Sequence, residues 1–103
     1  MQYYRLEQLI NLHEGYCRRF QIDQHQLLLL ERDGERLLIE GRCPHRGHLF
    51  SADDIGEQQL RCPLHGYCFD VYSGALIKAT EEPCRGLVSY ELIYRDKEVG
   101  VML

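Results

Sequence analysis

The sequence lacks a long apolar run, an excess of basic residues and an N-terminal leader pattern. Its longest apolar run is Leu27–Leu30, whereas a membrane-spanning helix needs about 20 such residues. Residues 1–5 show neither the basic region nor the apolar stretch of a signal peptide, so we expect a cytoplasmic protein without a membrane segment. The 12 Lys and Arg against 16 Asp and Glu give a net charge of -4. That balance excludes a basic nucleic-acid binder, whose pI would exceed about 9.

The size and composition indicate one globular domain with an unusual number of thiols. The chain has 103 residues, of which 45% are hydrophobic and 27% charged. We expect a single domain over residues 1–103, because no linker or internal repeat divides this length. Five cysteines are too many to be incidental, and their odd number disfavours a disulfide framework. They point to metal binding or thiol chemistry. We expect Cys17, Cys68 and Cys84 as small buried side chains, with a Cys68–Cys84 disulfide as an alternative.

Short strand patterns separated by turn signals predict an all-β fold. Asp33-Gly34 predicts a type I′ hairpin turn. A second hairpin turn is expected at 95–97, and residues 5–12 favour one or two helical turns. The expected strands are residues 17–22, 25–31, 36–40, 88–94 and 98–102.

Between these hairpins the sequence changes character. Residues 41–86 hold six of the nine glycines, all three prolines and four of the five cysteines. This segment has too little continuous apolar pattern to fold on strand pairing alone. A bound metal centre would supply the missing free energy, because ligand binding is coupled to folding.

Two short motifs in this segment pair a thiol with an imidazole. They are Cys43-Pro44-His45 and Cys62-Pro63-Leu64-His65, which together read C-x-H-x16-C-x2-H. Two thiolates and two imidazoles suit zinc or an iron–sulfur centre. Structural zinc sites usually pair like ligands, whereas here each loop supplies one Cys and one His. The pattern therefore favours a binuclear centre, with both cysteines on one iron and both histidines on the other.

The motifs resemble those of Rieske-type [2Fe–2S] ferredoxins. The sequence matches the C-P-H-x-G and C-P-x-H-G loops and the F-D-x-x-x-G extension at residues 69–74, and Pro83 lies where the family has a proline over the cluster. The resemblance implies one [2Fe–2S] cluster, held by Cys43, His45, Cys62 and His65. It also implies stacked antiparallel sheets, a β sandwich, in which a cluster-binding subdomain at about 42–67 is inserted into a framework of about 1–41 and 68–103. The residues expected around the ligands are Gly47, His48, Leu64, Gly66, Tyr67, Phe69 and Pro83.

Neighbouring positions separate this sequence from the Rieske proteins of respiratory and photosynthetic complexes. That branch joins its loops by a disulfide at the positions of His48 and Leu64 here. It also has hydrogen-bonding Ser and Tyr hydroxyls where this chain has Tyr67 and Phe69. Fewer hydrogen bonds to the cluster sulfurs imply a potential at the low end of the Rieske range, about -150 mV. The resemblance is therefore to the soluble, oxygenase-ferredoxin-like branch.

The resemblance implies an electron carrier that is not an enzyme by itself. We expect a monomer that takes electrons from a flavin or NAD(P)H reductase and passes them to a terminal oxygenase or another redox protein. A small Rieske-like subunit of an assimilatory nitrite reductase remains an alternative, and so does a zinc-stabilised binding module. No Gly-rich dinucleotide motif is present, so the reductase would be a separate chain.

Overall fold

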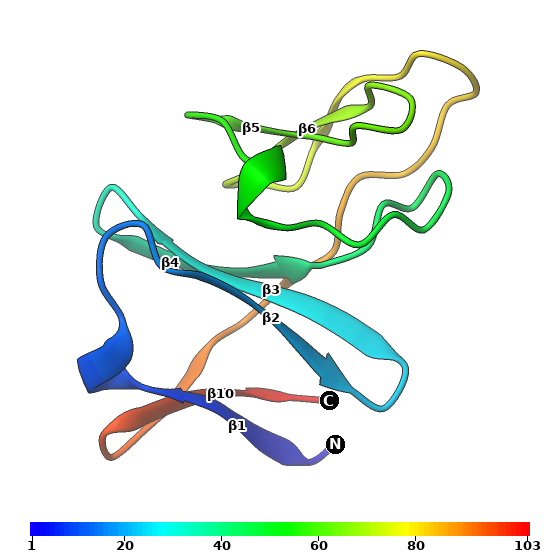
Figure 1. The fold of residues 1–103 in the computed structure, drawn as a ribbon. Helices are drawn as coiled ribbons and strands as arrows, with labels where there is room; N and C mark the ends of the chain where they lie inside the picture. Colours follow the sequence, from blue (N-terminus) through cyan, green and yellow to red (C-terminus); the bar gives the residue numbers. More distant parts are fainter.

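The computed structural model describes residues 1–103 as ten strands and two short 3-10 turns in three antiparallel sheets (Figure 1). The all-β prediction is confirmed. One sheet has the order β1-β10-β9, the second β2-β3-β4-β8 and the third β5-β6-β7. No helix is long or apolar enough to cross a membrane. The strands are β1 (Tyr3–Gln8), β2 (Cys17–Ile22), β3 (His25–Arg32), β4 (Glu35–Glu40), β5 (Gln59–Arg61), β6 (Cys68–Asp70), β7 (Leu76–Lys78), β8 (Ser89–Tyr90), β9 (Ile93–Arg95) and β10 (Glu98–Met102).

The central strand β3 explains the run of four leucines. Side chains alternate between the two faces of a strand, so Leu27 and Leu29 point one way while Leu28 and Leu30 point the other. All four are at most 1% exposed because both faces of this sheet are covered (Figure 1). One face packs on the β1-β10-β9 sheet through what we call the base core, made of Leu6, Leu12, Leu27, Leu29, Leu38, Val99 and Val101.

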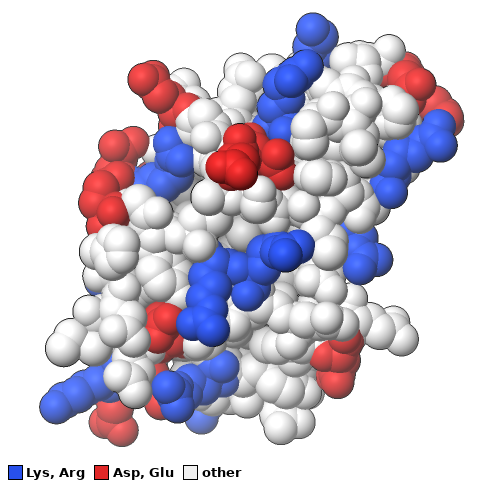
Figure 2. Space-filling model, viewed as in Figure 1, with Lys and Arg blue, Asp and Glu red and all other residues white.

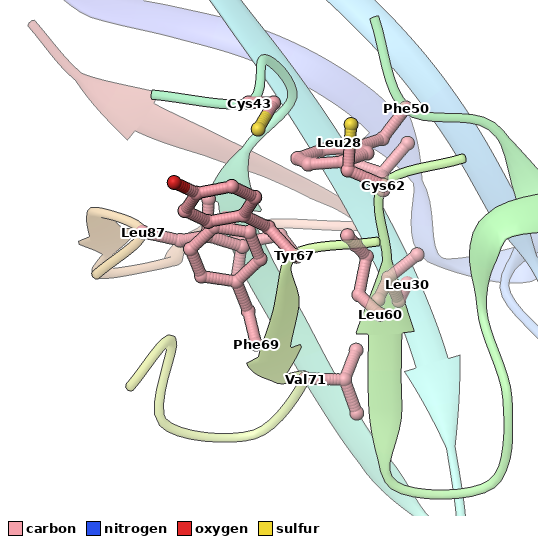
Figure 3. Close-up of a cluster of buried hydrophobic side chains, with 11 residues drawn as sticks. Leu28, Leu30, Cys43, Phe50, Leu60, Cys62, Tyr67, Phe69, Val71 and Leu87 are labelled. Carbon is pink, nitrogen blue, oxygen red and sulfur yellow. The ribbon is translucent and has the colours of Figure 1, made fainter. Parts of the chain in front are cut away.

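The opposite face of the same sheet supports the β5-β6-β7 sheet. Between them lies a second cluster, which we call the loop-side core (Figure 3). The sulfurs of Cys43 and Cys62 lie at one edge of this core, while Val71 lies at the other end (Figure 3). The loop-side core consists of Leu28, Leu30, Ile39, Cys43, Phe50, Leu60, Cys62, Tyr67, Phe69, Val71 and Leu87.

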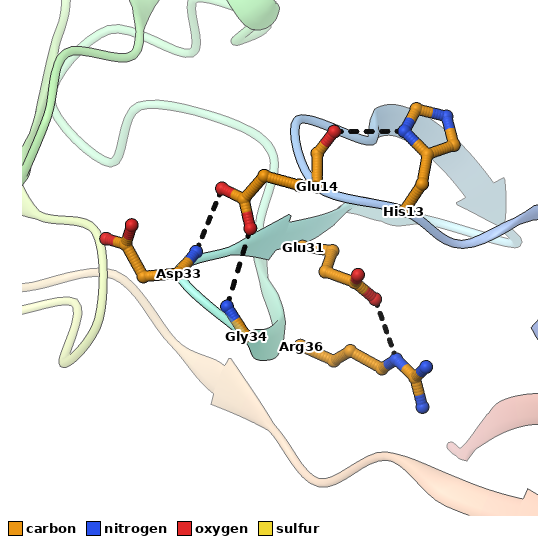
Figure 4. A network of polar contacts seen from close by, with 6 residues as sticks. All are labelled: His13, Glu14, Glu31, Asp33, Gly34 and Arg36. Carbon is orange, nitrogen blue, oxygen red and sulfur yellow. Dashed lines mark hydrogen bonds and ion pairs between the residues drawn. The ribbon is translucent and has the colours of Figure 1, made fainter.

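The hairpin turn predicted at Asp33-Gly34 is confirmed. Both residues have positive φ, 52° and 77°, as a type I′ turn requires. The Glu14 carboxylate accepts hydrogen bonds from the backbone N–H groups of Asp33 at 2.9 Å and Gly34 at 3.4 Å (Figure 4). The turn between β9 and β10 is also present, with Asp96 at φ 52°.

The helical turns predicted for residues 5–12 are mostly wrong. Residues Tyr3–Gln8 form strand β1, and only Leu9–Asn11 form a 3-10 turn, η1. Tertiary pairing overrides the local pattern here, because β1 pairs with β10 on both sides of a register shift at Leu6, and Leu6 is buried in the base core.

The strand predicted at 88–94 is divided between two sheets. Its first part, β8, pairs with β4, and its second part, β9, pairs with β10. The chain crosses from one layer of the base to the other between them. The sheet that begins with β5 continues through β6 and β7 to Lys78, beyond residues 42–67 of the predicted insertion, whose boundaries stay a prediction. The other predicted strands match within one residue, with β3 reaching Arg32 and β4 starting at Glu35.

Candidate metal centre

Two loops with the same backbone pattern carry the predicted ligands. In the first loop, residues 42–49, the Cys43 N–H donates to the His48 carbonyl at 2.8 Å, and the Gly47 N–H donates to the Cys43 carbonyl at 2.7 Å. An isolated β-bridge between Arg42 and Leu49 closes this loop. The backbone of this loop therefore folds back on Cys43 and fixes the direction of its thiol.

The second loop, residues 61–68, repeats these contacts. The Cys62 N–H donates to the Tyr67 carbonyl at 2.8 Å, and the Gly66 N–H donates to the Cys62 carbonyl at 2.9 Å. Gly47 and Gly66 occupy equivalent positions with φ of 79° and 76°, a left-handed conformation that a side chain would disfavour. Both glycines therefore allow the chain to turn back on the preceding cysteine.

The loops bring the two thiols together in the loop-side core. Cys43 and Cys62 are each 1% exposed and belong to the same buried cluster. Burial raises the pKa of Cys43, although backbone N–H groups of His45 and Arg46 directed at its sulfur oppose that effect. A buried thiol pair with amide donors aimed at the sulfur suits a bound metal, whose charge removes the thiol proton.

The two imidazoles lie beside each other at the same end of the molecule. The His45 and His65 rings are edge-to-face with centroids 5.3 Å apart, and His45 stacks on Tyr67 at 4.2 Å. The His45 side chain is 7% exposed, and neither of its buried ring nitrogens makes an aligned hydrogen bond. Such unsatisfied groups are costly in a native fold, and metal ligation is one way to satisfy them. The residues present therefore fit a centre held by two thiolates and two imidazoles.

The other predicted neighbours fall into two groups. Tyr67 and Phe69 are fully buried, and the Tyr67 hydroxyl donates to the backbone carbonyl of Glu82. His48 turns away from the imidazole pair, because its ring nitrogen Nε2 lies 3.0 Å from Asp54 Oδ2 in the 3-10 turn η2 (Ala52–Asp54). Leu64, at 56%, and Pro83 are exposed.

The remaining cysteines are free thiols. Cys68 is buried, while Cys17 and Cys84 are half-buried, so the alternative of a Cys68–Cys84 disulfide is wrong for this structure. The expectation of small buried side chains holds fully only for Cys68. All five cysteines therefore remain available as thiols, but only Cys43 and Cys62 lie in the two matched loops.

One contact at the imidazoles has no counterpart in the motif-based prediction. Glu81 Oε1 lies 3.2 Å from His45 Nε2 and 3.8 Å from His65 Nδ1. These three side chains place their possible ligand atoms within 4.8 Å of one another. Glu81 stands outside both motifs, so no spacing rule could have identified it.

One protein-family model matches the part of the chain that contains both loops and most of the strands. The model described as the Rieske [2Fe-2S] domain matches residues 2–91. The chain belongs to the Rieske [2Fe–2S] domain family. The family resemblance inferred from the two motifs is thereby confirmed.

Solved structures agree with this membership over the whole chain. The Sphingomonas yanoikuyae B1 ferredoxin is 26% identical with a TM-score of 0.75, and the match covers 97% of each chain. A structure titled as a complex of reduced oxygenase and oxidized ferredoxin in carbazole 1,9a-dioxygenase matches at 21% identity and TM-score 0.72, over 96% of this chain and 91% of that chain. A putative nitrite reductase small subunit matches at 16% identity and TM-score 0.69, over 100% of both chains. The last two likenesses are likenesses of fold.

Curated relatives match a shorter stretch. Apoptosis-inducing factor 3 of Mus musculus and of Homo sapiens are each 30% identical over 66 residues, which are 64% of this chain. The matched stretch is 11% of the length of either relative. This family's domain therefore occurs both as a chain of this length and within much longer proteins.

Proposed function

We propose that this protein is a Rieske ferredoxin that carries single electrons and is not an enzyme by itself. One observation carries the proposal: two buried thiols and two adjacent imidazoles converge from matched loops at one end of a Rieske fold. Cys43, His45, Cys62 and His65 would hold one [2Fe–2S] cluster. When bound, the cluster supplies a one-electron couple, whose oxidised form is neutral with two thiolates and two neutral imidazoles.

Different residues would bind the cluster and shield it from water. The thiols lie inside the loop-side core, where Phe50, Leu60 and Tyr67 exclude water from them. The His45 side chain is 7% exposed, whereas the His65 side chain is 37% exposed. The edge of His65, beside the exposed Leu64, is therefore the point where an electron leaves toward a docked partner.

We propose a flavin or NAD(P)H reductase as the electron donor and a terminal oxygenase or another redox protein as the acceptor. The likeness of fold to the chain in the oxygenase–ferredoxin complex of carbazole 1,9a-dioxygenase, over 96% of this chain and 91% of that chain, supports an oxygenase partner. Basic and acidic side chains are interspersed on the face shown in Figure 2. A face of this kind suits transient docking of a redox protein, to which we expect the protein to bind as a monomer, and we expect no nucleic-acid partner.

The metal content of the purified protein tests this proposal. Anaerobically isolated protein should contain about two iron and two acid-labile sulfide ions per chain, and it should titrate as a one-electron couple. A colourless protein that holds zinc alone would establish the binding module instead. Absence of both iron and sulfide would overturn the proposed centre.

A second measurement separates the carrier from the nitrite reductase subunit. The carrier should elute as a free monomer and be reduced by NADH only when a flavin-dependent ferredoxin reductase is added. Co-purification in a fixed complex with a larger reductase chain would support the nitrite reductase alternative, since the putative small subunit has a similar fold over 100% of both chains, with a TM-score of 0.69.

A further inference from the structure

We propose that Glu81 is a positioning residue that holds the His45 imidazole and lowers the reduction potential of the centre. The inference rests on the proposed function, because it concerns the same ligand set. Its starting point is the carboxylate found between the two imidazoles, 3.2 Å from His45 Nε2 and 3.8 Å from His65 Nδ1.

The contact gives the two nitrogens of His45 different environments. Both ring nitrogens are buried and neither makes an aligned hydrogen bond, but Nε2 lies 3.2 Å from Glu81 Oε1. A metal-binding imidazole commonly directs its other N–H at a carboxylate, which fixes the tautomer and makes the ligand more basic. Under the proposal, Glu81 would accept a hydrogen bond from Nε2 while Nδ1 serves as the metal ligand.

Hydrogen bonds on both sides hold Glu81 in place. The Thr80 hydroxyl donates to the His65 carbonyl, and the Tyr67 hydroxyl donates to the Glu82 carbonyl. Both contacts tie the segment around Glu81 to the second loop. The carboxylate is 44% exposed, yet its backbone is anchored immediately before and after it. The contact with the imidazoles is therefore built into the fold rather than left to a free surface side chain.

The negative charge of Glu81 should lower the reduction potential of the centre. Reduction adds one negative charge to a centre that is otherwise neutral, and a nearby carboxylate repels it. A more basic imidazole ligand also stabilises the oxidised metal. Both effects disfavour the reduced state, so removal of the carboxylate charge should raise the reduction potential.

The test compares Glu81→Gln with Glu82→Gln in the fully loaded protein. The two changes remove the same charge from adjacent residues, but the Glu82 carboxylate forms no ion pair with either imidazole. At the ambient potential where the unmodified protein is half reduced, Glu81→Gln should be mostly reduced, with the ratio of reduced to oxidised protein increased about fivefold or more. Glu82→Gln should change that ratio by less than about twofold.

Glu81→Asp distinguishes charge from shape, since it keeps the carboxylate one methylene further from the rings. It should restore a ratio between those of the unmodified protein and Glu81→Gln. Equal ratios in Glu81→Gln and Glu82→Gln would overturn the inference while leaving the carrier function intact. Absence of iron and sulfide from the unmodified protein would instead refute the proposed function itself. If Glu81→Gln assembles no centre, an unchanged ratio in Glu81→Asp would equally overturn the inference.

Discussion

A methyl group at Gly74 should weaken the junction between the β5-β6-β7 sheet and the base of the molecule. Gly74 ends the F-D-x-x-x-G extension, and its carbonyl accepts a hydrogen bond from the Leu87 N–H at 2.7 Å. A Cβ added at Gly74 would lie 2.5 Å from the Leu87 carbonyl oxygen. Because that neighbour is backbone, it cannot simply rotate away, and the chain around Leu87 must move.

The expected cost follows from three local effects. The Gly74 φ of 80° is left-handed and costs about 1–2 kcal/mol for a residue with a side chain. The displacement weakens a hydrogen bond worth about 1 kcal/mol. It also disturbs Leu87, a residue of the loop-side core that is 6% exposed, at a cost of about 1 kcal/mol. We therefore expect Gly74→Ala to destabilise the protein by about 3–4 kcal/mol.

Gly34→Ala is the matched control. Gly34 has nearly the same φ, 77°, but a Cβ there would meet nothing within 4 Å. Its cost should be the backbone strain alone, about 1–2 kcal/mol. Thermal unfolding of both loaded variants at one scan rate should place Gly74→Ala about 10 °C below Gly34→Ala. Coincident midpoints would show that the close approach to Leu87 contributes nothing and would refute the reasoning.

Three further measurements test the proposed site and the base of the molecule. Elemental analysis of Cys43→Ala should find no bound iron or sulfide. Cys17→Ala, which changes a free thiol outside both loops, should retain both. Retained iron in Cys43→Ala would disprove the ligand role of Cys43. The reduction potential should lie near the low end of the Rieske range, about -150 mV, because Phe69 has no hydroxyl and that of Tyr67 is bound to a backbone carbonyl; a titration giving more than about +100 mV would contradict this. The pKa of Glu7 is lowered to about 2, first by the Asn11 side chain and then by the Tyr16 hydroxyl and a backbone N–H. Because the pKa of Glu7 is depressed in the folded state, this stabilisation is present above about pH 4.5 and is lost toward pH 2. Urea titrations should therefore show Glu7→Gln to be less stable than the unmodified protein by on the order of 3 kcal/mol at pH 7, with a difference that decreases in acid. A difference that stays constant from pH 7 to pH 3 would refute this prediction.

Local signals in the sequence were sufficient for the hairpin turn and for both ligand loops. Asp33-Gly34 specifies its turn through residues that tolerate positive φ, and each Cys–His motif folds back on itself by hydrogen bonds within six residues. The strands β2, β3 and β4 follow from the same kind of information, since they are consecutive and joined by tight turns. These features are encoded where they occur.

Non-local pairing accounts for what the sequence did not reveal. Strand β1 exists because β10, from the other end of the chain, lies beside it, and the residues of β1 alone resemble a helical pattern. Likewise β8 and β9 read as one strand until β4 and β10 pair with them separately. Glu81 reaches the imidazoles only because hydrogen bonds from the second loop fix the segment around it. In each case the local sequence of the segment contains no signal that identifies its distant partner.

The position of the proposed ligands inside the loop-side core would link metal binding to folding in this chain. Cys43 and Cys62 are members of the same buried set as Phe50, Leu60 and Tyr67, so they are packing residues as well as proposed ligands. The β5-β6-β7 sheet has three-residue strands, too short for independent stability. Without metal, this core would contain two buried thiols and an unsatisfied buried imidazole at its edge. The base core uses none of these residues. Loss of metal should therefore loosen the β5-β6-β7 sheet first and leave the base sheets paired, which amide hydrogen exchange of iron-free protein can resolve strand by strand.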